Sequence, residues 1–103
     1  MRKATVLVNR SIAGILTEVE KGRKYQFEYR DGYSGEPVSL TMPVRQQVWE
    51  FDRFPPFFEG LLPEGFQLES LLKQMKIDRD DHFSQLMAVG QDMVGAVTVQ
   101  PEE

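Results

Sequence analysis

The chain has 103 residues, a hydrophobic fraction of 41%, a charged fraction of 27% and a formal net charge of −4. This length fits one domain with one hydrophobic core, and the composition excludes an intrinsically disordered chain. Because the chain has no cysteine, disulfide and thiolate chemistry are excluded as well.

The charge is unevenly distributed along the sequence. Residues 1–24 contain six Lys or Arg and two Glu, a sum of +4, whereas residues 25–103 contain six Lys or Arg and fourteen acidic residues, a sum of −8. Nucleic-acid binding needs clustered basic residues with little acid nearby, so we expect no direct nucleic-acid binding. The first apolar run, residues 6–8, is too short for a signal peptide or a membrane span, and we expect a cytoplasmic protein.

The amino-terminal part of the chain predicts four short strands, at residues 5–8, 12–17, 25–29 and 38–42. The third is the clearest, because its aromatic residues alternate with polar ones, as in a half-buried strand. Gly14 in the second predicts a bulge or a close backbone approach. The connections are short, which favours antiparallel pairing over parallel crossovers.

The most apolar stretch runs from Phe54 to Gly65. It begins with two prolines after Phe54, which suit the entrance of a helix because they fix φ and cannot donate a hydrogen bond. Pro63 and Gly65 end this helix. A helix this short is unstable in water, so we expect it to be inserted into the core by four residues that share one face: Phe57, Phe58, Leu61 and Leu62.

Two longer helices and a closing strand are expected next. The first helix covers residues 66–77 and buries residues at i, i+3, i+4 and i+7: Leu68, Leu71, Leu72 and Met75. The second opens with Asp78, Asp80 and Asp81 and ends at Gly90, for which we expect a positive φ. Asp92 is expected to accept backbone N–H groups in the turn before a strand at 94–99. The second helix is expected to contribute Phe83, Leu86 and Met87 to one core. The apolar residues of the inserted stretch and of the first helix belong to the same core, together with Phe27 and Val97.

The predicted fold class is α+β, with a small antiparallel sheet of about five strands packed with two to three short helices. Residues for catalysis are few. His82 is the only histidine and is expected to be solvated or to cap a helix. A calcium loop starting at Asp78 would need Glu at Val89, and the G-x-x-x-x-G spacing from Gly90 lacks the lysine of a phosphate loop. We expect Glu59 and Glu64 to be solvated, and no catalytic, cofactor or metal site.

Trp49 and Phe51 lie in a segment, residues 46–53, that mixes large apolar and charged side chains. Two interpretations are open: these aromatic residues cover the sheet, or they anchor a protein interface, where Trp, Tyr and Arg are enriched. The second interpretation places the segment in a loop. Its anchors would be Trp49, Phe51, Arg53 and Phe54, and its polar rim would be Arg45, Glu50, Asp52 and Arg53.

Several short segments of the sequence resemble the N-terminal domain of HipA-type serine/threonine kinases. They are Gly14-x-Leu16-Thr17, Phe27-x-Tyr29, Ser39-Leu40-x-x-Pro43, Phe57-Phe58-x-x-Leu61-Leu62-Pro63-Glu64 and Gly90-x-Asp92-x-x-Gly95-Ala96-Val97. The resemblance spans residues 5 to 100, and the last two segments are its most specific parts. In that family the domain precedes a kinase core that supplies the ATP, metal and phosphoacceptor machinery. No residue of that core is present here, so the resemblance implies a protein without catalysis.

A HipA N-terminal domain without a kinase core is similar to the HipS antitoxins of three-gene HipBST toxin–antitoxin systems. This resemblance implies a HipT-like serine/threonine kinase as the partner, with a helix-turn-helix HipB-like protein in the same complex. The alternative is an interaction or regulatory domain excised from a longer HipA-like kinase. A separate domain binds without the help of a linker, so it needs an interface of about 800 Å² per partner.

Overall fold

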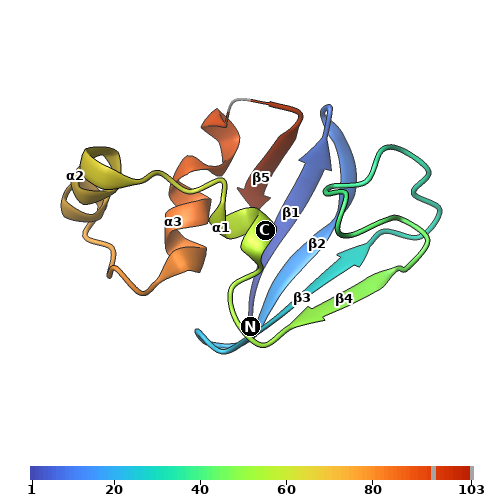
Figure 1. The fold of residues 1–103 in the computed structure, drawn as a ribbon, viewed down its shortest axis with the longest axis horizontal. Helices are drawn as coiled ribbons and strands as arrows, with labels where there is room; N and C mark the ends of the chain where they lie inside the picture. The colour runs from blue at the N-terminus through green and yellow to red at the C-terminus, as the bar shows by residue number, and fades with distance from the viewer. Residues whose placement is uncertain (94, 103) are drawn as a thin grey trace.

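The computed structural model describes residues 1–93 and 95–102. Its elements are β1 (Arg2–Val8), β2 (Ser11–Glu20), β3 (Lys24–Tyr29), β4 (Val48–Phe51), α1 (Pro56–Glu59), α2 (Gly65–Met75), α3 (His82–Val89), the 3₁₀ turn η1 (Gly90–Asp92) and β5 (Val97–Pro101). The strands form one antiparallel sheet in the order β4-β3-β2-β1-β5 (Figure 1). The predicted α+β class is therefore confirmed.

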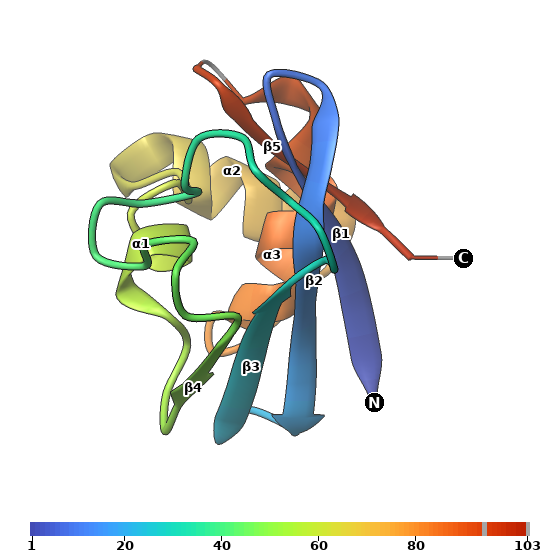
Figure 2. The ribbon, with the colours of Figure 1, turned by 90° about the vertical axis from the view of Figure 1, so that its right-hand side faces the viewer.

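The three helices all lie on one face of the sheet (Figure 2). The hairpin of β1 and β2 turns through Asn9 and Arg10, whose φ values are 50° and 71°. Positive φ at both central residues matches the twist of a tight hairpin. Both strands extend beyond their predicted bounds, because the pairing continues from Val8 opposite Ser11 to Arg2 opposite Glu18.

Gly14 shows both a bulge and a close backbone approach, the two alternatives predicted for a glycine within this strand. The register between β1 and β2 shifts at Val6 and Leu7, beside this glycine. A Cβ atom at position 14 would also overlap the backbone carbonyl of Glu28 on the neighbouring strand. The glycine therefore permits β2 and β3 to approach more closely than any other residue would.

The fourth strand is not at the predicted position. The segment 38–42 contains only an isolated bridge, and Val48–Phe51 forms β4 instead. The cause is Tyr29, whose hydroxyl accepts the N–H of Val38 (2.9 Å) and donates to the carbonyl oxygen of Met42 (2.5 Å). A side chain thus satisfies backbone groups that a strand would pair in its ladder.

Helix α2 is less buried than its periodicity predicted. Leu68, Leu71 and Leu72 are only half-buried, and Met75 is 57% exposed. The helix stands away from the sheet and packs beside α3 (Figure 1). The helical periodicity correctly identified the face of α2 that packs against the domain. It did not predict that the domain covers this face only in part. No helix in the described part of the chain has the length and apolar character needed to cross a membrane.

The core lies between the sheet and helices α1 and α3. Four of its predicted members are confirmed as fully or almost fully buried: Phe27, Phe58, Phe83 and Leu86. Other predicted members are only partly buried at its margin: Phe57, Leu61, Leu62, Met87 and Val97. On β5 the fully buried residue is Val99, opposite Val6 of β1, whereas Val97, opposite Val8, is only partly buried.

Candidate functional site

The aromatic residues predicted as partner anchors lie on β4, at one edge of the sheet. The prediction of a loop here is wrong, because β4 pairs with β3, with Trp49 opposite Phe27 and Phe51 opposite Tyr25. The strand order places β4 at the end of the sheet. An edge strand presents backbone N–H and C=O groups to which another chain can pair.

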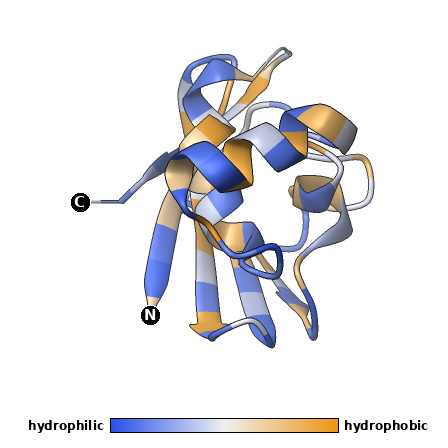
Figure 3. Ribbon diagram, turned by 90° about the vertical axis from the view of Figure 1, so that its left-hand side faces the viewer, coloured by the Kyte–Doolittle hydropathy of each residue, from blue (hydrophilic) through white to orange (hydrophobic). Residues whose placement is uncertain are grey.

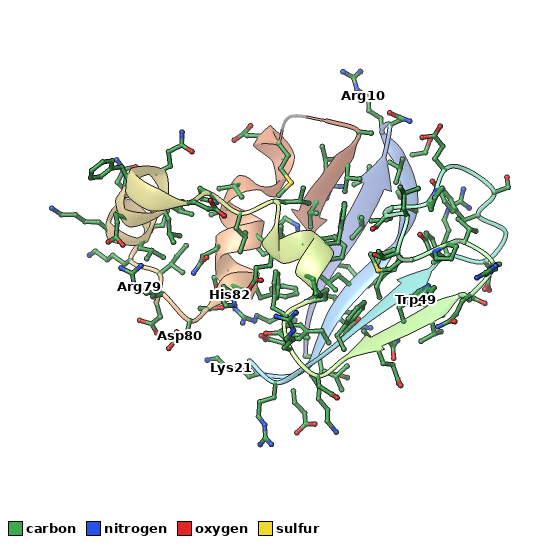
Figure 4. The ribbon with its side chains drawn as sticks, viewed as in Figure 1. Arg10, Lys21, Trp49, Arg79, Asp80 and His82 are labelled. Carbon is green, nitrogen blue, oxygen red and sulfur yellow. The ribbon has the colours of Figure 1, made fainter. Side chains whose placement is uncertain are left out.

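Trp49 and Phe51 share features of both open interpretations. Their partners across the ladder, Phe27 and Tyr25, are buried, so the two aromatic rings lie on the face of the sheet that packs into the core. Both rings pack against that core yet remain half-exposed. The Nε1–H of Trp49 donates to the carbonyl oxygen of Gln46 (2.9 Å), which fixes the ring. Figure 4 shows Trp49 on the β3–β4 side of the molecule.

Arg53 and Phe54 have opposite environments. Arg53 is exposed, whereas Phe54 is 4% exposed and meets the ring of Tyr25 edge to face, with centroids 5.3 Å apart. A side chain this buried cannot touch a partner in this conformation, so Phe54 belongs to the core instead. All predicted rim residues are exposed: Arg45, Glu50, Asp52 and Arg53.

The apolar stretch after β4 enters the core as predicted, but only through Phe58 of the four predicted residues. Pro56 begins α1, where its missing N–H costs no helical hydrogen bond. Phe58 is fully buried, and its ring centroid lies 6.1 Å from that of Phe27. The winding continues past α1, because the Leu61 N–H donates to the Phe58 carbonyl oxygen (3.1 Å). The flanking residues of this motif are half-buried: Phe57, Leu61, Leu62 and Pro63.

The glycines of the closing segment serve two purposes. Gly90 has φ of −60°, so the predicted positive φ is wrong; the chain continues into the 3₁₀ turn η1. Glycine is required there because a Cβ atom would overlap the carbonyl oxygen of Val99 on β5. Gly95 has φ of 121°, where glycine is favoured. Asp92 is exposed, and its predicted turn includes Val94, outside the described residues, so that hydrogen-bond assignment stays a prediction.

A charged cluster that the sequence pattern did not identify joins the sheet to α3. The guanidinium of Arg2 donates to both carboxylate oxygens of Glu18 (2.7 and 2.9 Å), to Asp81 (2.9 Å) and to the hydroxyl of Ser84 (2.8 Å). The side chain of Glu18 is only 4% exposed and also accepts the hydroxyl of Tyr25 (3.3 Å). The available signal was the hairpin register, which places Arg2 opposite Glu18.

The contacts within this cluster shift the pKa values of its members. The hydrogen bond to Glu18 raises the pKa of Arg2 above its ordinary value. Burial alone would raise the pKa of Glu18 and of Asp81, but the hydrogen bonds from Arg2, with those from Gly22 and Ser84, hold both pKa values below the ordinary ones. Burial and the nearby Glu18 charge raise the pKa of Tyr25 to about 12. At neutral pH Arg2, Glu18 and Asp81 are therefore ionised and Tyr25 is neutral, and the ion pairs fasten α3 to the sheet.

The remaining chemical candidates form no catalytic arrangement. His82 is half-buried, with its ring centroid 5.4 Å from that of Phe54, so it is neither fully solvated nor the cap. Asp81 caps α3 instead by accepting the N–H of Ser84 (3.1 Å). Glu59 and Glu64 are exposed. Among the described residues, no group of three or more His, Cys, Asp or Glu side chains is placed to hold a metal ion.

Comparisons with known proteins match the whole chain. The sequence profile of the family described as HipA N-terminal domain matches residues 4–100. A solved structure of the N-terminal domain of HipA toxin has a TM-score of 0.78 and 30% identity, and the alignment covers 100% of this chain and 94% of that one. An uncharacterised protein of Haemophilus influenzae is 33% identical over 103 residues, which are 100% of this chain and 95% of that protein.

Two longer relatives, Y4dM and Y4mE, come from Sinorhizobium fredii, and both are named as kinases without an established activity. Y4dM is 32% identical over 116 residues, with 100% of this chain aligned, and Y4mE is 29% identical over 82 residues, with 80% aligned. The chain spans only 28% of the length of Y4dM and 20% of that of Y4mE. The same domain therefore occurs in proteins of very different lengths.

Proposed function

The chain belongs to the HipA N-terminal domain family, and on that premise we propose that it is an antitoxin that binds and neutralises a separate HipT-like serine/threonine kinase. The match to residues 4–100 leaves no kinase domain within the 103 residues. One observation carries the proposal: this domain makes up 28% of Y4dM, but a relative from Haemophilus influenzae is almost entirely covered by it. A domain that is part of long kinases can then act on a kinase as a separate protein.

The proposed mechanism is that the chain occupies the place of the fused N-terminal domain beside the nucleotide-binding lobe of the kinase. It would act in the cytoplasm, either by restraining that lobe or by obstructing its cleft. Binding of a fluorescent ATP analogue to the kinase separates the two mechanisms. Obstruction lowers the affinity of the kinase for the analogue when the chain is added, whereas restraint leaves this affinity unchanged and lowers only phosphoryl transfer.

The direct test is co-expression of this chain with a HipT-like serine/threonine kinase. We expect growth arrest by the kinase alone, rescue of growth by the chain, and co-purification of the two proteins. A helix-turn-helix HipB-like protein, added to the purified pair, is expected to shift it to a larger complex in size-exclusion chromatography. If the chain neither binds the kinase nor rescues growth, the antitoxin proposal is rejected.

Trp49, Phe51 and Arg53 are the proposed anchors on the β4 side. Trp49→Ala is expected to weaken kinase binding by at least about 2 kcal/mol, the usual threshold of a hot spot. Because the ring packs against the core, the variant will also lose stability, so binding is measured by calorimetry at a temperature where melts show it folded. Val48→Ala is the matched control, since Val48 is 39% exposed and points to the opposite face of β4. Equal affinities for parent and Trp49→Ala would reject this anchor.

The second candidate function is a regulatory domain of one longer HipA-like kinase. It is favoured by Y4dM, in which the whole of this chain aligns with 28% of the length. The two functions differ in what the isolated chain does to a kinase from which the N-terminal domain has been deleted. An antitoxin abolishes phosphoryl transfer by that kinase. A detached regulatory domain binds it and restores the behaviour of the intact enzyme.

A further inference from the structure

The end of the molecule that carries α2 has a groove, and Figure 3 looks onto this end. One part, of about 530 Å³, lies between the turn after α1 and the end of α3, and its lining includes Leu61, Leu62, Val89 and Met93. A second part, of about 470 Å³, runs along α2, with Phe66 and Leu71 in its wall. The two parts share Pro63, Gln67 and Val89, so they form one continuous α2 groove.

Most side chains that line the α2 groove are apolar, and the lining is nearly uncharged. Among the described residues that line it, Asp92 is the only ionisable one, and the other polar side chains are the amides of Gln67 and Gln74 and the hydroxyl of Ser70. By contrast, the hollow beside the charged cluster is lined mostly by charged side chains. A nearly uncharged lining with mostly apolar side chains suits the buried centre of a protein interface, from which charged residues are depleted. It does not suit a nucleic acid or another polyanion, which basic groups bind.

Phe66 is the feature that marks the groove as an incomplete surface. It is 94% exposed, although a phenylalanine is among the residues that gain most from burial. Its helix, α2, has no fully buried residue and packs beside α3. The apolar side chains of this amphipathic helix are therefore only partly buried within the domain.

We propose that the α2 groove is the surface on which the HipT-like kinase docks, with an apolar segment of the kinase lying against Phe66 and Pro63. This inference rests on the function proposed above. The occupant is identified from the relatives, in which this domain is only 28% and 20% of the chain. In those relatives, the rest of the same chain can bury the apolar surface that this domain leaves exposed. For a domain that is a separate protein, a separate kinase would bury the same surface.

The groove lies far from the β4 edge. Figure 1 shows α2 and β4 at opposite ends of the molecule, whose longest dimension is 40 Å. Figure 4 likewise separates Trp49 from Arg79 and Asp80, which follow α2. Variants in the groove therefore test a surface that is distinct from the Trp49 anchor.

The test compares Phe66→Asp with Leu40→Asp in binding to the HipT-like kinase. Leu40 is the matched control, because it is 93% exposed and lies outside the groove, so both variants exchange an exposed apolar side chain for a charge. We expect affinity for the kinase to fall at least about 30-fold for Phe66→Asp and to change less than about threefold for Leu40→Asp. Gln67→Glu, which places a charge where the two parts meet, is expected to weaken binding about tenfold or more.

Each outcome has a separate meaning. Because Phe66 and Gln67 are exposed, thermal melts of both variants are expected to match the parent. If the parent binds the kinase and both groove variants bind equally well, the groove inference is overturned while the proposed function stands. If the parent itself does not bind, the proposed function fails. Equal losses in Leu40→Asp and Phe66→Asp would also overturn the inference, as would a parent dimer that Phe66→Asp dissociates without changing kinase affinity.

Discussion

Gly90 and Gly60 have nearly the same backbone conformation, with φ of −60° and −65°, but different surroundings. A Cβ atom at position 90 would overlap the carbonyl of Val99, whereas at position 60 it would meet its nearest neighbour, the Phe57 carbonyl oxygen, at 3.4 Å. We expect Gly90→Ala to lower the free energy of unfolding by about 1–3 kcal/mol through overpacking. Gly60→Ala is expected to be neutral or to stabilise by up to about 1 kcal/mol. Urea denaturation measures both, and equal effects would contradict the close-approach explanation.

Arg2 is the residue on which the charged cluster depends. In the variant Arg2→Met, the buried Glu18 and the neighbouring Asp81 lose their shared cation. We expect a loss of about 1–3 kcal/mol at pH 7, less than for a fully buried pair because the side chain of Arg2 is 37% exposed. Arg45→Met, at an exposed arginine outside the cluster, is the control and is expected to change stability by less than about 0.5 kcal/mol.

The same cluster predicts how stability depends on acid. The pKa values of Glu18 and Asp81 in the folded protein lie below their ordinary values of 4.5 and 3.8, so their contribution is complete above about pH 4.5 and is lost as the pH falls through the lowered values. We therefore expect the stability difference between parent and Arg2→Met to shrink between pH 5 and about pH 2. A difference that stays constant over this range, measured by urea denaturation, would show that the ion pairs are not its source.

Among the elements, α1 and α2 have opposite relations to the core although both carry large apolar side chains. Phe58 on α1 is fully buried in the core, whereas Leu68 on α2 is only half-buried. We expect Phe58→Ala to cost about 3–5 kcal/mol and Leu68→Ala about 1 kcal/mol, because only the first leaves a cavity in a closed core. Both are measured by urea denaturation. A loss at Leu68 as large as that at Phe58 would mean that α2 is an integral part of the core.

The elements also show what could be predicted from local sequence. Strand β3 and the inserted helix α1 were correctly located, since alternation and the proline pair are signals within a few residues. The segment 38–42 was not, because the hydroxyl of Tyr29 competes for its backbone groups. A hydrogen bond between a strand and a distant loop leaves no trace in local periodicity. Strand β4 was missed for a related reason: its pairing with β3 spans a long connection.

At the scale of the whole molecule, the candidate surfaces were only partly predictable. Trp49 was identified from residue type, but the burial of Phe54 depends on contacts with Tyr25 and His82 from elsewhere in the chain. The α2 groove could not be derived from the sequence, because its walls come from the turn after α1, from α2 and from α3. The helical period assigned Leu71 to a buried face. Only the position of α2 away from the sheet shows that this face stays partly open.

The separation of Trp49 and Phe66 along the molecule leads to a prediction about the kinase interface as a whole. Distant residues without shared contacts contribute additively to binding, whereas residues coupled through one cluster do not. If the kinase contacts both ends of the domain, the free-energy losses of Trp49→Ala and Phe66→Asp should add in the double variant to within about 0.5 kcal/mol. Calorimetry with the kinase measures the three variants. A double variant no weaker than Phe66→Asp alone would restrict the interface to the α2 groove and assign Trp49 to the margin of the core.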